Sequence, residues 1–260
     1  MLVAVASAKG SPGATALAVV LAALWPREVA LADVDPAGGD LALRYRAPDG
    51  SPLEEDRGLL SLGAAVRRGA DVKLSPHLQP VSGGLDVLVG VSAPEQVAGL
   101  GPVWGSVAKA LRPGGQDVVA DCGRVLPGAA LMPVLAGADA VVLVVRPDVA
   151  GVAHLRERLA ALAEPLRLGE PGGVPLGVVV RAGERERRAA ADVGALLASG
   201  GAPVPVLGVL AEDPRGVVAL EQQRPGAGRS SFVRSARTLL PAVTALAERS
   251  LPVPAAARGR

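Results

Sequence analysis

Short runs of β-branched residues alternate along this chain with longer Ala- and Leu-rich segments of helical period. This alternation is typical of repeated strand–helix–strand units, which form a parallel sheet covered by helices. We therefore predict an α/β fold with a single doubly wound, mostly parallel sheet flanked by helices. The expected strands are residues 2–6, 29–33, 85–89, 118–121, 140–145, 176–180 and 204–210. The expected helices are residues 14–24, 59–68, 103–111, 152–163, 184–198 and 231–249.

Composition agrees with this class of fold. Half of the 260 residues are apolar and only 2% are aromatic, which suits helices packed closely on a Val-rich sheet. Segments 47–57 and 164–173 are rich in Pro, Gly and charge, and neither is long enough to separate domains. We therefore expect one domain over residues 1–250 and a disordered tail over residues 251–260, which has little apolar content.

Charge and cysteine content exclude several classes of function. The formal net charge of +2 is too small to indicate an obligate nucleic-acid partner. Cys122 is the only cysteine, which excludes an internal disulfide and a cysteine-based zinc site and favours a reducing compartment. The first residues form an apolar run that is too short to span a bilayer, and they lack the basic flank of a signal peptide. We expect a cytoplasmic protein with no transmembrane segment.

A glycine-containing turn joins the first expected strand to the first expected helix. It reads Ser7-Ala8-Lys9-Gly10-Ser11-Pro12-Gly13-Ala14-Thr15. Glycines let successive backbone N–H groups point inward, and the N-terminus of the helix adds positive potential, so such a turn can hold a phosphate. Thr15 stands where the hydroxyl of a phosphate loop would bind Mg²⁺. A tight connection without a ligand is the alternative, and the turn alone does not decide between them.

The segment from Lys9 to Thr15 resembles the deviant Walker A motif of the MinD/ParA family, Lys-Gly-Gly-x-Gly-Lys-Thr. Ser11 stands for the second glycine, and Ala14 is the mismatch. The resemblance implies the P-loop NTPase fold, ATP and Mg²⁺ as cofactors, and a homodimer in which Lys9 reaches the partner's nucleotide. It also implies nucleotide contacts by Lys9, Gly10, Ser11, Pro12, Gly13, Ala14, Thr15 and Ala16. Because the lysine expected at Ala14 holds the β- and γ-phosphates, we expect weak or absent ATP hydrolysis.

Two further segments resemble landmarks of this family. The segment 32–40 is similar to the switch segment Asp-x-Asp-Pro-x-Gly-Gly, which implies that Asp35 orients the attacking water and Asp33 supports Mg²⁺. Asp121 follows an apolar run, as the Walker B aspartate does, which implies that it holds Mg²⁺ through water. A capped surface turn at Asp33 and Asp35, and a helix cap at Asp121, are the alternatives.

Later positions depart from the family pattern. Arg181 follows the strand 176–180, where the family usually has an Asn that reads adenine, so the base specificity stays open. Asp213 keeps the acid of the family's Ile-Pro-x-Asp segment, although the proline is missing. We include both residues among the expected nucleotide contacts.

Other candidate residues are expected to have ordinary roles. His77 and His154 lack partners at metal-ligand spacing, and Cys122 is expected as a small buried side chain. Arginines around residue 185 alternate with glutamates, which indicates a solvated face rather than a DNA surface. The last helix is expected to pack on the sheet rather than lie on a membrane, with Pro241 interrupting it.

The resemblance implies a nucleotide-dependent dimerising switch that positions or regulates a larger assembly. Chromosome partitioning, septum placement and, through the degenerate CpaE/TadZ-like branch, a Tad-type pilus or secretion machinery are the candidate roles. The implied partners are a second copy and a protein of that assembly, while contact with DNA or with the inner face of the membrane stays open. The first alternative is a non-enzymatic scaffold of the same fold, favoured by Ala14 and Arg181. The second is a Rossmann dinucleotide enzyme, disfavoured because the third glycine of that pattern is missing.

Overall fold

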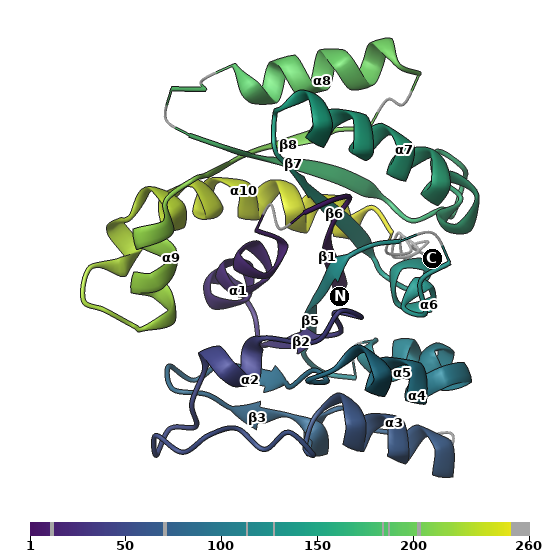
Figure 1. Ribbon diagram of the computed structural model, residues 1–260, viewed down its shortest axis with the longest axis vertical. Helices are drawn as coiled ribbons and strands as arrows, with labels where there is room; N and C mark the ends of the chain where they lie inside the picture. The colour runs from purple at the N-terminus through teal and green to yellow at the C-terminus, as the bar shows by residue number, and fades with distance from the viewer. Residues whose placement is uncertain are drawn as a thin grey trace, which may run out of the picture.

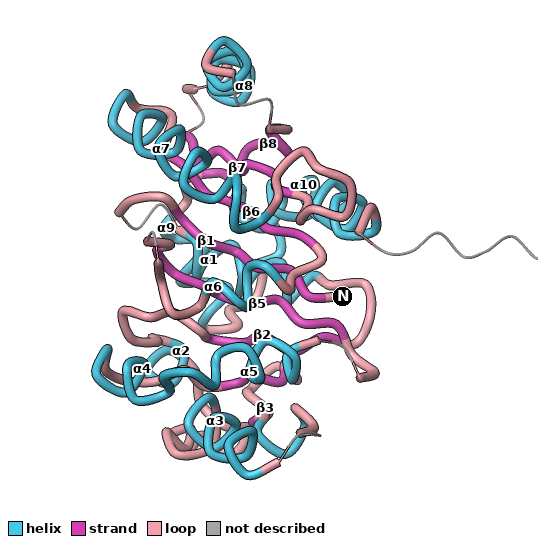
Figure 2. Tube along the Cα trace, turned by 90° about the vertical axis from the view of Figure 1, so that its right-hand side faces the viewer, coloured by secondary structure: helices cyan, strands magenta, loops and turns pink. Residues whose placement is uncertain are grey.

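One mixed sheet forms the centre of the molecule. The computed structural model describes residues 1–10, 13–69, 72–112, 114–126, 128–183, 185–186, 188–201 and 204–250. Within them, eight strands follow the order β3-β4-β2-β5-β1-β6-β7-β8 (Figures 1 and 2). The strands are β1 (Leu2–Ser7), β2 (Val29–Asp33), β3 (Gln79–Pro80), β4 (Asp86–Leu88), β5 (Asp117–Arg124), β6 (Ala140–Val145), β7 (Leu176–Ala182) and β8 (Val206–Ala211). Among these described strands only β3 pairs antiparallel to its neighbour, so the predicted doubly wound, mostly parallel α/β fold is confirmed.

Helices cover both faces of the sheet. Alternate residues of β1 point to opposite faces, and both sets are buried. Leu2, Ala4 and Ala6 face a core shared with α3 (Leu59–Arg68), α4 (Pro94–Leu100), α5 (Trp104–Leu111), α6 (Met132–Ala136), α7 (Val149–Leu166) and α8 (Ala189–Ser199). Val3 and Val5 face a second core shared with α1 (Ala14–Leu24), α2 (Leu41–Arg44), α9 (Pro214–Glu221) and α10 (Ser231–Glu248). Figure 1 shows α1 on one side of β1 and α6 on the other. Strands buried on both faces explain the continuous apolar runs in the sequence.

Several expected boundaries are wrong, and each error has a local cause. The expected helix 184–198 begins at Ala189, and its expected first residue, Glu184, lies outside the described residues. The helix expected over 152–163 is longer, because Asp148 caps α7 and Leu166 continues its buried stripe. Part of the expected loop 164–173 is therefore helical. The short helices α2, α4, α6 and α9 and the short strand β3 were not predicted.

The last helix packs on the sheet, as expected. Phe232, Leu239 and Val243 of α10 are buried in the core that includes α1. The expected interruption at Pro241 is wrong, because α10 continues through this exposed residue while the turns on both sides of it bury apolar side chains. Among the described helices, none combines the length and apolar content that crossing a bilayer requires. The expected disordered tail, residues 251–260, lies outside the described residues.

Candidate functional site

The turn between β1 and α1 has an open helix N-terminus. Gly10 and Gly13 adopt positive φ angles of 69° and 98°, which favour glycine. Among the described residues no side chain caps α1, so its first N–H groups and the positive end of the helix dipole face the turn. A Cβ atom at Gly10 would meet nothing within 4 Å, so the turn is open on that side. Ser11 and Pro12, two of the expected phosphate contacts, lie outside the described residues.

The two aspartates expected to support Mg²⁺ lie side by side at the carboxyl edge of the sheet. Asp33 ends β2 and is the register partner of Asp121 in β5. Both are buried, with exposed fractions of 1% and 2%. Asp33 accepts hydrogen bonds from the N–H groups of Asp35 and Leu41, both at 3.3 Å, and Asp121 accepts one from Gly123 at 3.1 Å. The two carboxylates that the resemblance assigns to Mg²⁺ therefore lie together, and both are buried rather than at the surface.

Glycines make room for these carboxylates. A Cβ atom at Gly39 would lie 2.3 Å from the Asp33 side chain, and one at Gly90 would lie 2.7 Å from it. A Cβ atom at Gly123 would lie 2.0 Å from the Asp35 carboxyl group. Real Cβ atoms do not approach so closely, so the aspartates occupy space that only glycines leave free. Gly90 and Gly123 are thus site residues that sequence analysis missed.

Burial and mutual repulsion raise the pKa values of the three aspartates. Burial, followed by the charge of Asp121, raises the pKa of Asp33 to about 7, against hydrogen bonds from backbone N–H groups. Burial also raises the pKa of Asp121 to about 6, although a side-chain hydrogen bond from Thr15 lowers it. Burial raises the pKa of Asp35, and Asp40 adds to the rise. The surroundings of these carboxylates therefore hold too little positive charge to offset their burial.

The donor set fits magnesium held partly by a ligand. Among the described residues, no group of three or more His, Cys, Asp or Glu side chains is arranged to bind a metal by itself. Mg²⁺ in proteins usually keeps several waters and takes one or two carboxylates together with phosphate oxygens. The hydroxyl of Thr15, which lowers the pKa of Asp121, and the carboxylates of Asp33 and Asp121 supply oxygen donors of the right kind. Their chemistry fits this mode of binding better than a metal site built from protein alone.

Lys9, expected to reach a partner's nucleotide, contacts its own chain here. Its Nζ atom lies 2.7 Å from Nε2 of His154 on α7. The other ring nitrogen of His154, Nδ1, lies 3.2 Å from a carboxylate oxygen of Glu157. Sequence analysis gave His154 only an ordinary role, because Lys9 and His154 are 145 positions apart and no local pattern links them.

Arg181 and Asp213, the two expected nucleotide contacts from the later part of the sequence, lie in different surroundings. The guanidinium of Arg181 lies against Gly13 in the turn, where a Cβ atom would be 2.5 Å from Nη1. The carboxylate of Asp213 instead caps α9, accepting a hydrogen bond from Gly216 N at 2.8 Å, and accepts another from the Ser231 hydroxyl at 2.8 Å. Asp213 therefore ties α9 to α10 and is already engaged.

A small cavity lies beside the turn, and a larger one lies elsewhere in the molecule. One of about 180 Å³ lies beside the turn, lined by Ala8, Lys9, Gly10 and the segment 144–151. It is smaller than the roughly 300–1,000 Å³ of typical ligand pockets. A larger cavity of about 810 Å³ lies at the amino end of β7, against α7 and α10, away from the aspartates. Neither cavity is lined by Arg181, whose guanidinium lies over Gly13.

Comparison with solved structures identifies the fold. A ParA family ATPase from Chlorobium tepidum TLS superposes with a TM-score of 0.70 at 16% identity, over 94% of this chain and 98% of that one. The chain has the fold of the ParA and MinD ATPases. MinD from Pyrococcus horikoshii OT3, complexed with Mg-ADP, gives 0.67 at 21% identity over 97% and 99%. The ATP complex of a single-residue variant of Cyanothece McdA gives 0.69 at 17% identity over 97% of both chains. No family model and no curated protein matches the sequence.

Proposed function

We propose that this chain is a MinD/ParA-like switch protein, which binds a magnesium nucleotide at the turn between β1 and α1 and dimerises in the nucleotide-bound state. The observation that carries this proposal is the buried pair Asp33 and Asp121, in register on neighbouring strands, with Thr15 close enough to lower the pKa of Asp121. Two buried like charges are costly without a cation, so their retention favours a site that binds one. Fold similarity supports the proposal, because proteins of this fold were solved with Mg-ADP and ATP.

Each residue of the site has a proposed task. Gly10, Gly13 and the first N–H groups of α1 hold phosphate oxygens. Thr15, Asp33 and Asp121 hold Mg²⁺, which offsets the phosphate charge. Asp35, held over Gly123, orients the attacking water.

Hydrolysis is proposed to be weak or lost. Ala14 is buried and apolar at the position where the family has a phosphate-binding lysine. One cation that stabilises the phosphoryl transition state can contribute about 10³–10⁵ in rate. The proposed switch therefore depends on binding and release of nucleotide more than on turnover.

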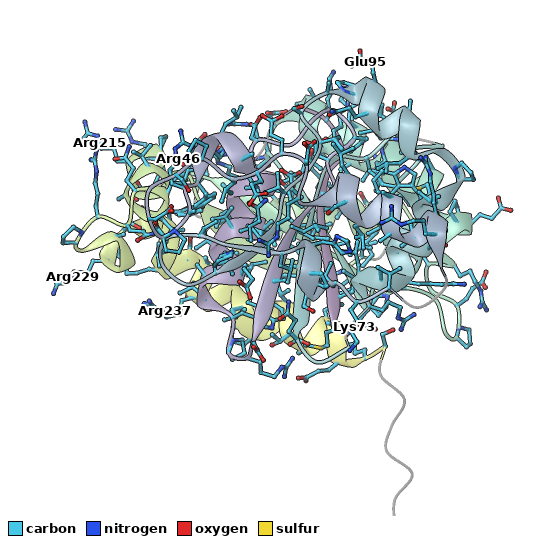
Figure 3. The ribbon with its side chains drawn as sticks, turned by 90° about the horizontal axis from the view of Figure 1, so that it is seen from below. Arg46, Lys73, Glu95, Arg215, Arg229 and Arg237 are labelled. Atoms are coloured by element: carbon cyan, nitrogen blue, oxygen red, sulfur yellow. The ribbon has the colours of Figure 1, made fainter. Side chains whose placement is uncertain are left out.

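The nucleotide-bound dimer is proposed to position or regulate a larger cytoplasmic assembly. One protein of this fold, MinD of Aquifex aeolicus, was solved in complex with MinC. For this chain, the candidate assemblies are a partitioning complex, the division septum and, in the CpaE/TadZ-like branch, a Tad-type pilus or secretion machinery. Exposed arginines of the 46 loop, α9, η3 (Ala227–Arg229) and α10 lie on one side of the molecule, where Figure 3 labels Arg46, Arg215, Arg229 and Arg237. That side is the candidate face for contact with DNA or the inner face of the membrane.

Light scattering and calorimetry test this function. Wild type is expected to bind Mg-ATP and to shift from monomer to dimer when Mg-ATP is added. Ala14→Lys is expected to tighten binding by about 10- to 100-fold, because a charge-assisted hydrogen bond contributes roughly 1.5–3 kcal/mol. Ala23→Lys, which adds a lysine at the exposed end of α1, is the matched control and should leave binding unchanged. Absence of Mg-ATP binding in wild type and Ala14→Lys, with an unchanged mass, would contradict the proposal.

A non-enzymatic scaffold of the same fold is the second candidate. Its supporting observation is the guanidinium of Arg181, which lies on Gly13 where a nucleotide would approach. Such a scaffold would have the same mass with and without Mg-ATP, and wild type would give no heat of nucleotide binding.

A further inference from the structure

Arg181 reaches the phosphate-binding turn from two strands away. It lies near the end of β7, and β6 separates β7 from β1 in the sheet. A Cβ atom at Gly13 would lie 2.5 Å from Nη1 of Arg181, 3.3 Å from Cζ and 3.4 Å from Cδ. The end of the side chain therefore lies over Gly13, next to the N-terminus of α1.

The guanidinium has no anionic partner of its own. Among the described residues, none forms a hydrogen bond or ion pair with Arg181, and the nearby Glu212 pairs with Arg146 at 3.1 Å. Burial lowers the pKa of Arg181, Glu212 raises it and Arg146 lowers it. Arginine nevertheless stays protonated at neutral pH. Arg181 is thus a half-buried cation that an arriving anion would stabilise.

Two other cations near the turn have partners, and Arg124, the register partner of Ser7, is exposed. Lys9 contacts His154, and Arg146 pairs with Glu212. Ala14 has no charge. Within the described part of the chain, Arg181 is therefore a cation that lies on the turn and forms no hydrogen bond or ion pair.

We propose that Arg181 supplies the positive charge that Ala14 lacks, by binding the phosphate groups of the nucleotide held at this turn. This inference rests on the proposed nucleotide binding and assigns Arg181 to the phosphates rather than to the base. A planar guanidinium donates two parallel hydrogen bonds to a phosphate, which a lysine cannot do. The ligand class is therefore a nucleotide recognised mainly through its phosphates, with little selection of the base.

Calorimetric titration of the full chain tests the role of Arg181. The ligands are adenosine, Mg-ADP, Mg-ATP, Mg-GTP and magnesium pyrophosphate, and the variants are Arg181→Met, Arg181→Lys and Ala14→Lys/Arg181→Met. Arg181→Met keeps much of the side-chain length and removes the charge. It is expected to weaken Mg-ATP and pyrophosphate binding by about 10- to 100-fold and to leave adenosine binding unchanged. Arg181→Lys is expected to lose less, and the double variant to recover most of the loss. Mg-GTP should bind within a few-fold of Mg-ATP.

Arg185→Met is the matched control, because Arg185 is exposed, follows the same strand and should leave binding unchanged. Thermal unfolding without ligand shows whether each variant folds, and Arg181→Lys extends the test if Arg181→Met does not. Tighter Mg-ATP binding by Arg181→Met would overturn the inference, because Arg181 would then block the turn. An equal loss for adenosine and Mg-ATP would also overturn it.

If wild type binds Mg-ATP but remains monomeric, the dimerising switch fails while the role of Arg181 stands. If wild type binds none of the phosphate ligands, both fail.

Discussion

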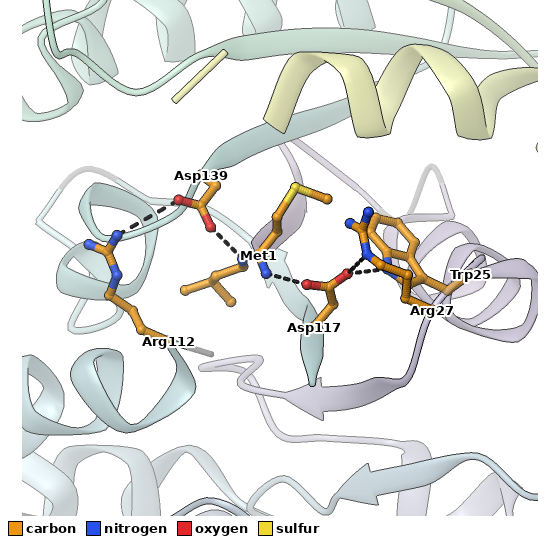
Figure 4. Close-up of polar contacts among 7 residues, drawn as sticks. Met1, Trp25, Arg27, Arg112, Asp117 and Asp139 are labelled. Atoms are coloured by element: carbon orange, nitrogen blue, oxygen red, sulfur yellow. Dashed lines mark hydrogen bonds and ion pairs between the residues drawn. The ribbon is translucent and has the colours of Figure 1, made fainter. Parts of the chain in front are cut away.

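Strand β5 has one aspartate at its amino end and another near its carboxyl end, and their surroundings shift the two pKa values in opposite directions. Asp117, at the amino end, forms an ion pair with the Met1 amino group and accepts hydrogen bonds at 2.8 Å from Trp25 Nε1 and Arg27 Nε (Figure 4). Burial raises the pKa of Asp117, but these partners outweigh it and lower the pKa overall. Asp121, four residues later, has its pKa raised to about 6. The fold thus neutralises acids at one edge of the sheet and leaves them short of positive charge at the other.

A second acid at the amino edge follows the same rule. Asp139 accepts a hydrogen bond from Leu2 N at 2.7 Å and lies 3.7 Å from Arg112 (Figure 4). Asp117 and Asp139 join the start of β1 to segments that begin β5 and β6. Acids at this edge hold the strands together, whereas at the carboxyl edge burial raises the pKa values of Asp33 and Asp121.

The largest expected effect comes from removing the acid at the amino edge. Asp117→Ala leaves the buried Met1 amino group and the Trp25 N–H without their acceptor. We expect a loss of about 3–5 kcal/mol in the free energy of unfolding, as when one partner of a buried ion pair is removed. Urea unfolding at pH 7 measures it. A loss below about 1 kcal/mol would mean that the partners of Asp117 neutralise its charge no better than the surroundings of Asp121 neutralise that aspartate.

A smaller effect of opposite sign is expected at the carboxyl edge. The folded-state pKa of Asp33, about 7, exceeds its ordinary value of 3.8, so between these values the folded chain holds a proton that the unfolded chain has lost. The contribution of Asp33 to stability without magnesium or nucleotide therefore falls as pH rises from about 4 to 7. Asp33→Asn removes this fall and is expected to stabilise the unliganded chain by about 2–4 kcal/mol at pH 8 and by little at pH 4.

Urea unfolding of wild type and Asp33→Asn at both pH values, in the presence of a chelator, measures this difference. Asp86→Asn, which alters an acid of β4 with no register contact to Asp121, is the control. A destabilising effect of Asp33→Asn at pH 8 would remove the contrast between the two edges.

The smallest effect is expected for Arg112→Ala. The Arg112 side chain is 57% exposed, its pair with Asp139 spans 3.7 Å, and Asp139 keeps its bond to Leu2 N. Exposed pairs contribute little, so we expect a change of about 0.5 kcal/mol or less in unfolding free energy. Thermal unfolding in low and high salt measures it. A change comparable to that of Asp117→Ala would mean that Arg112, rather than backbone hydrogen bonding, holds Asp139.

Sequence patterns predicted the parts of this molecule that depend on local regularity. Apolar runs such as 140–145 matched β6, and the family resemblance, which places Asp33 and Asp121 at one Mg²⁺, agrees with their register. The short helices α2, α4, α6 and α9 span too few turns for a period to emerge. The contacts of Lys9 with His154 and of Arg181 with Gly13 join distant positions through long side chains, and no spacing rule encodes them.

The contact between Lys9 and His154 has a consequence for assembly. If Lys9 reaches the partner's nucleotide in the proposed dimer, it must leave His154. Because His154 belongs to the same chain, its effective concentration around Lys9 is about millimolar or more. Association then gains only the difference between an intermolecular hydrogen bond and the intramolecular one that it replaces. Such a trade would weaken the proposed dimer and speed its separation.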